Sequence, residues 1–130
     1  MLESSVIDLS ELSRRTGFAP DAFIFVQEGL QHTLKMIHGE PTTEDLFDDN
    51  ARHVSGRQLC LGLRDLAVHQ FGVLARLVLA KWNIDSTEDF GRVVFALVDA
   101  GLLRKTDEDT LEDFRGVYDF ADAFGGRAAV

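Results

Sequence analysis

Five amphipathic or apolar segments make up most of this sequence, and each is followed at once by glycine or asparagine. These residues tolerate the left-handed backbone conformation that commonly ends a helix. The segments and their terminators are residues 6–16 with Gly17, 20–38 with Gly39, 56–71 with Gly72, 73–82 with Asn83, and 87–100 with Gly101. The chain is therefore expected to be mostly α-helical, with short connections between its helices.

The starts of three of these segments carry local helix signals. Pro20 and Asp21 suit the first turn of the segment 20–38. Ser55 and Gln58 have the spacing of a capping box, which predicts a helix that begins at residue 56. Ser86 precedes Asp89 in the same manner, and predicts a helix start at residue 87.

The apolar pattern predicts which helix faces are buried. Residues Phe23, Val26, Leu30, Leu34 and Ile37 form a stripe along 20–38, and Phe90, Val93, Val94, Leu97 and Val98 form one along 87–100. Residues 73–82 are apolar nearly all round, which predicts a central, buried helix.

The C-terminal part reads as two strands. The sequences LLRKT and FRGVYDF, joined by DEDTLED, predict an antiparallel pair. Three helices followed by a hairpin, with Tyr118 in the returning strand, resemble the second half of a winged-helix domain. The predicted class is therefore α+β, mostly α: N-terminal helices plus a three-helix core with a C-terminal β-hairpin, in a winged-helix-like arrangement.

Length and composition indicate one domain. A chain of 130 residues can bury a single core, with about residues 1–5 and 125–130 expected to fray. Cys60 is the one cysteine, so no internal disulfide is expected. The N-terminus does not resemble a signal peptide, and the most apolar stretch, FGVLARLVLAKW, is too short to span a bilayer. We expect a cytoplasmic protein with no membrane association.

The net charge of −9 is unevenly distributed and weighs against nucleic acid as a partner. Residues 1–55 carry −6, residues 56–106 carry +2 and residues 107–130 carry −5. The predicted recognition helix opens with Thr87, Glu88 and Asp89, and the predicted wing is acidic, so both would repel phosphates. A nucleic-acid-associated transcriptional regulator, the alternative hypothesis, would need six basic residues to converge on one face: Arg57, Arg64, Arg76, Lys81, Arg104 and Lys105.

Catalytic and metal-binding patterns are not found in the sequence. Its four histidines are scattered, and HExxH, CxxC, GxSxG and phosphate-binding glycine loops do not occur. Cys60 lies between two leucines, which favours a core role over a reactive one. No catalytic residue, cofactor or metal is predicted. An enzyme would require a pocket that brings His53 or His69 against carboxylates.

A non-enzymatic protein-interaction or adaptor module is therefore the leading hypothesis. The aromatic residues Phe114, Tyr118, Phe120 and Phe124 are the candidate partner surface, provided that part of the set is exposed. The partner itself is not predicted. The stripe along 20–38 could also pair with a second copy, so a homodimer is possible.

Several phrases of the sequence are similar to one family. The phrases FAPDAFIFVQEGLQHTL, HVSGRQL, STEDFGRVVFALVDAGLLRKT and DFRGVYDFADAF resemble an uncharacterised family of conserved hypothetical proteins, found chiefly in planctomycete and verrucomicrobial bacteria. The resemblance covers about residues 18–124. That family often has proline after the FG dipeptide, where this chain has Val73. The resemblance implies a single-domain bacterial cytoplasmic protein, and it assigns no site residue.

Overall fold

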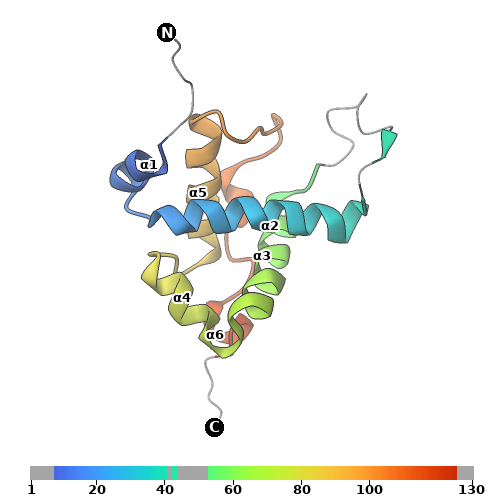
Figure 1. The fold of residues 1–130 in the computed structure, drawn as a ribbon. Coiled ribbons are helices and arrows are strands. Elements are labelled where there is room, and N and C mark those ends of the chain that lie inside the picture. Colours follow the sequence, from blue (N-terminus) through green and yellow to red (C-terminus); the bar gives the residue numbers. More distant parts are fainter. Residues whose placement is uncertain (1–7, 41, 44–52, 126–130) are drawn as a thin grey trace.

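The computed structural model describes residues 8–40, 42–43 and 53–125, and these residues form a helical protein (Figure 1). The helices are α1 (Leu9–Thr16), α2 (Pro20–His38), α3 (Gly56–Phe71), α4 (Ala75–Lys81), α5 (Thr87–Asp99) and α6 (Phe120–Ala123), with 3₁₀ turns η2 (Gly72–Leu74) and η3 (Leu111–Phe114). Helix α2 is the longest and lies across α3 and α5.

Helix ends follow the local signals in the sequence. Helix α2 begins at Pro20, and Gly39 follows it with φ 75°. The Ser55 hydroxyl accepts a hydrogen bond from the Gln58 amide, and the Gln58 side chain accepts one from the Ser55 amide, so the predicted capping box of α3 is confirmed. The Ser86 hydroxyl caps α5 as predicted, and Asn83 has φ 71° after α4.

The close crossing of α2 and α3 depends on two glycines. A Cβ atom at Gly29 would collide with the Leu63 side chain, and one at Gly62 would collide with Thr33. Thr33 is buried, and its hydroxyl donates to the Gly29 carbonyl at 2.7 Å. Each helix thus presents a glycine to a larger side chain of the other, which lets the two backbones approach.

The main core lies between α2, α3 and α5. Its fully buried side chains include Phe23, Val26, Leu63, Phe90 and Leu97. An aromatic cluster of Phe25, Phe71 and Trp82 closes the end near α4. Of the stripe predicted on α2, Phe23 and Val26 are buried, Leu30 and Leu34 are half-buried, and Ile37 at the far end is 42% exposed.

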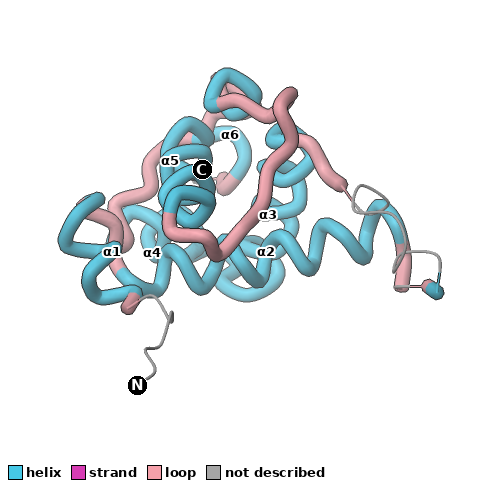
Figure 2. The backbone as a smooth tube through the Cα atoms, turned by 90° about the horizontal axis from the view of Figure 1, so that it is seen from above, coloured by secondary structure: helices cyan, strands magenta, loops and turns pink. Residues whose placement is uncertain are grey.

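The predicted C-terminal hairpin is wrong. The described residues contain no strand, and the chain after α5 runs as loop, η3, loop and α6 (Figure 2). Side chains satisfy backbone groups that a hairpin would have paired. The buried Thr87 hydroxyl donates to the Phe114 carbonyl at 2.6 Å and accepts from the Val117 amide at 3.2 Å. The Tyr118 hydroxyl donates to the Cys60 carbonyl at 2.7 Å. The α+β, winged-helix-like class is therefore replaced by an all-helical one over the described residues.

The predicted central position of the apolar segment 73–82 is also wrong. Helix α4 lies at the edge of the molecule, and only Ala75 and Leu79 of its seven residues are buried. These two residues are four apart, so they occupy one side of a short helix. No further helix covers the opposite side in the described part of the chain.

Some predictions concern residues outside the described ranges. They are the expected fraying of residues 1–5 and 126–130 and the first two residues of the predicted segment 6–16.

Candidate functional site

An exposed apolar surface lies at the α4 end of the molecule. It consists of Val68, Val73, Leu74 and Leu77, with exposed fractions of 46%, 93%, 55% and 61%. We call these four residues the α4 surface. Val73 and Leu77 are four positions apart along η2 and α4, and Leu74 and Leu77 are three apart, so these side chains share one side of the turn and helix. The 3₁₀ turn η2 packs against α3, and α3 carries Val68.

The segment that carries most of the α4 surface is basic along the sequence, in a chain that is acidic overall. Residues 66–84 contain Arg76 and Lys81 and no Asp or Glu, whereas the whole chain carries −9. Arg76 and Lys81 are both exposed on α4. Two positive charges on α4 thus accompany the apolar side chains, while Asp85 follows α4 and helix α6, which carries Asp122, lies at the same end of the molecule (Figure 1).

Helix α4 is held in place by its buried side and by its C-terminal end. Ala75 and Leu79 pack fully into the core. At the C-terminal end, the Asn83 side-chain amide donates to the Gly17 carbonyl at 2.6 Å, and the Trp82 carbonyl accepts from the Ala19 amide at 3.3 Å. The α4 surface is therefore carried on a helix that is anchored to the α1–α2 junction.

The predicted aromatic partner surface forms part of the core instead. Phe114, Phe120 and Phe124 are only 3%, 3% and 6% exposed. Tyr118 is half-buried, stacks on Phe120 and bonds to α3 through its hydroxyl. These side chains hold the C-terminal segment against α3 and α5, and they are not available to a partner.

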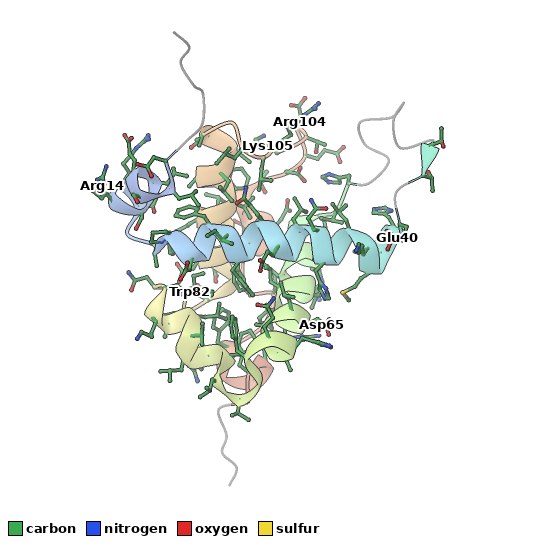
Figure 3. All side chains as sticks on the ribbon, viewed as in Figure 1. Arg14, Glu40, Asp65, Trp82, Arg104 and Lys105 are labelled. Carbon is green, nitrogen blue, oxygen red and sulfur yellow. The ribbon has the colours of Figure 1, made fainter. Side chains whose placement is uncertain are left out.

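The six basic residues of the nucleic-acid hypothesis do not gather on one face. Arg104 and Lys105 lie at the opposite end of the molecule from α4, which carries Arg76 and Lys81 (Figure 3). The Arg64 guanidinium lies 5.4 Å from the centre of the Tyr118 ring. Arg57 lines a groove with the carboxylates of Glu108, Asp109, Glu112 and Asp113. This dispersal removes the continuous positive surface that phosphate binding requires.

A separate pocket of about 240 Å³ lies between α2, α3, α5 and the loop after α5. We call it the His53 pocket. Its lining residues are Leu30, Leu34, His53, Val54, Ser55, Gly56, Leu59, Val94, Phe95, Val98, Leu103, Arg104, Lys105, Thr106, Asp109 and Phe114. The interior is apolar, and the polar side chains come from the segments 53–55 and 104–109.

The polar side of the His53 pocket holds a histidine–carboxylate pair. The His53 Nε2 atom lies 3.3 Å from Asp109 Oδ1. Asp109 Oδ2 accepts from the Thr106 amide at 2.8 Å and from its hydroxyl at 3.2 Å. The His53 carbonyl in turn is 2.8 Å from His38 Nε2. This meets the geometric condition stated above for an enzyme, a pocket that brings His53 against a carboxylate.

The hydroxyl groups of Ser55 and Tyr118 and the thiol of Cys60 already have structural roles. Ser55 Oγ accepts the capping bond of α3. Cys60 is fully buried, and desolvation raises the pKa of its thiol to about 12, with the Glu88 carboxylate contributing to the rise. Burial likewise raises the pKa of the Tyr118 hydroxyl. Neither group is ionised near neutral pH, so neither is an activated nucleophile.

The α4 surface and the His53 pocket differ in how far the sequence could predict them. The pattern of residues 73–82 predicted a buried helix and not the exposed α4 surface. A short segment that is apolar on every side buries all its faces only where other elements surround it. His53 and Asp109 lie far apart in the chain, and no spacing rule connects them. Only the fold brings these two side chains together.

Comparison with known proteins gives no relative. No family model, curated protein or solved structure matches the chain. Among the described residues, none of the helices has the length and apolar character needed to cross a membrane.

Proposed function

We propose that this protein is a non-enzymatic interaction module that binds a protein partner through the α4 surface. The observation that carries the proposal is the exposure of four large apolar side chains on one short, anchored region, with Val73 at 93%. Exposed apolar residues scattered singly are ordinary, whereas a group of them on one region is typical of interaction sites.

Charge favours a particular kind of partner segment. With Arg76 and Lys81 beside the apolar group and no acidic residue from 66 to 84, the complementary chemistry is an amphipathic segment of apolar side chains flanked by carboxylates. A second copy bound symmetrically would place Arg76 and Lys81 against the same two cations, which opposes a two-fold dimer through this surface.

An anionic membrane is a poorer match than a protein. The chain carries −9, so most of its surface would be repelled by acidic headgroups. Helix α4 has seven residues, and its exposed apolar group offers little area to insert among lipid chains.

The test is quantitative capture from native lysate by the full chain and by two variants. Leu77→Ser changes the α4 surface. Met36→Ser makes a similar change at a side chain of similar exposure on α2, 57% against 61% for Leu77. We expect a stoichiometric partner with the wild type and with M36S, and its loss with L77S. No stoichiometric partner, or equal capture by both variants, would contradict the proposal. Binding to anionic phospholipid vesicles that L77S abolishes would assign the α4 surface to a membrane instead.

A further inference from the structure

The His53 pocket combines an apolar interior with two exposed basic side chains among its lining residues, Arg104 and Lys105. Half-buried side chains of α2 and α5, among them Leu34 and Val98, face a space of about 240 Å³. The Phe95 and Phe114 rings meet edge to face with centroids 6.4 Å apart, which defines one wall. This volume is slightly below the ~300–1,000 Å³ of typical small-molecule sites, so it suits a compact ligand.

Two of the charged side chains that line the pocket are cations able to pair with an anion, whereas Glu108, Glu112 and Asp113 line the adjoining groove. Arg104 and Lys105 both line the pocket. Asp109 is the carboxylate among the lining residues, and it is already held by His53 and by Thr106. Lys105 Nζ donates to the Thr106 carbonyl at 3.3 Å, and an ammonium group has three donors, so it retains capacity for a ligand.

The apolar interior restricts the class of anion. A phosphate or sugar would leave polar groups against Leu34, Val98 and Phe95 without hydrogen-bond partners, and this is costly. A molecule with one carboxylate and a compact hydrocarbon body places its charge at Lys105 and its body against the leucine, valine and phenylalanine walls.

We propose that the His53 pocket binds a small monocarboxylate with an apolar body. The site is separate from the α4 surface and does not depend on the interaction proposed there. Arg104 and Lys105 lie at the opposite end of the molecule from α4 (Figure 3).

The probe is octanoate, titrated into the isotopically labelled full chain and followed by two-dimensional ¹H–¹⁵N NMR. Octylamine has a similar body with the opposite charge, and acetate has the carboxylate without the body. We expect saturable shifts on pocket-lining amides such as those of residues 95, 98 and 103–106, with octanoate at least tenfold tighter than either control. Equal binding of octanoate and octylamine, or shifts confined to residues 68–77, would overturn the proposal.

Variants test whether Lys105 contacts the carboxylate. They also distinguish binding in the pocket from binding at the α4 surface. Lys105 is exposed, so Lys105→Gln should fold normally and weaken octanoate binding about tenfold. Lys81→Gln makes the same change at the far end and should have no effect, as should Leu77→Ser. Binding that K105Q leaves unchanged, or that L77S removes, would refute the pocket assignment while leaving the α4 proposal to its own test.

Discussion

At the scale of single residues, buried polar groups determine how the C-terminal segment attaches to the helices. Thr87 is fully buried and makes two hydrogen bonds, one to the last residue of η3 and one to the segment that follows it. The Gly116 amide also donates to the Glu88 side chain at 3.3 Å. The first turn of α5 is thus covered by protein and is not free to enter a DNA groove.

Replacing Thr87 by valine keeps the shape of the side chain and removes its hydroxyl. The Phe114 carbonyl and the Val117 amide would then lose a buried partner, and we expect the free energy of unfolding to fall by about 1–3 kcal/mol. Thr87→Ser retains the hydroxyl and should cost less than Thr87→Val. Urea denaturation followed by circular dichroism measures both. Equal losses for the two variants would show that the hydrogen bonds contribute little.

The Cys60 thiol should be inert in the native state and should make stability depend on alkaline pH. Burial raises its pKa from 9.0 to about 12, so the unfolded chain ionises first as pH rises. Its contribution is complete below about pH 9 and is lost between about pH 9 and 12. At pH 10.5 the wild type should have lost about 2 kcal/mol more of its unfolding free energy than Cys60→Ala, relative to pH 8. Denaturation of both proteins at the two pH values measures this, and parallel pH profiles would contradict it.

At the scale of elements, the fold depends on the α2–α3 crossing, where Gly29 meets Leu63 and Gly62 meets Thr33. Gly62→Ala should lower the free energy of unfolding by about 1–2 kcal/mol, because the collision with Thr33 outweighs the gain in helix propensity. Gln70→Ala, on the exposed side of the same helix, should change it by less than about 0.5 kcal/mol. Thermal and urea unfolding report both changes, and a G62A protein as stable as the wild type would show that the helices separate at little cost.

Helix positions could be predicted from the sequence because their signals are local. Pro20, Ser55 and Ser86 lie at the helix starts that they specify. Gly39 and Gly72 directly follow the helices that they end. The conformation of the segment 102–119 depends on contacts with residues far away in the sequence. Thr87 and Tyr118 bond to groups 27 to 58 positions away, and no alternation of apolar residues within the segment reveals those bonds.

The candidate sites were less predictable than the helices, for the same reason. The apolar character of 73–82 was evident, but its exposure depends on which other helices surround α4. Phe114, Phe120 and Phe124 were predicted as part of a partner surface, and the fold buries them: Phe120 packs on Phe90 and Phe124, and Phe114 packs on Phe95. His53 and Asp109 belong to segments whose proximity follows from the packing of the loop after α5 against the α3 start.

At the scale of the whole molecule, the two ends of the protein differ in chemistry. One end carries the apolar α4 surface, and the other carries the His53 pocket with Arg104 and Lys105 among its lining residues. Most acidic residues lie outside residues 56–106, which carry +2 in a chain of net charge −9. The two proposals, a protein partner at the α4 surface and a small ligand in the His53 pocket, therefore concern opposite ends of the molecule.

The most direct test of the central claim is site-specific photo-crosslinking from the α4 surface. A benzophenone amino acid placed at position 77 should form a covalent adduct with one acidic partner protein in native lysate, and the same amino acid at position 36 should not. Mass spectrometry of the adduct should locate the crosslink in an apolar segment flanked by Asp or Glu. Equal crosslinking from the two positions, or no adduct from position 77, would contradict the assignment of the α4 surface as an interaction site.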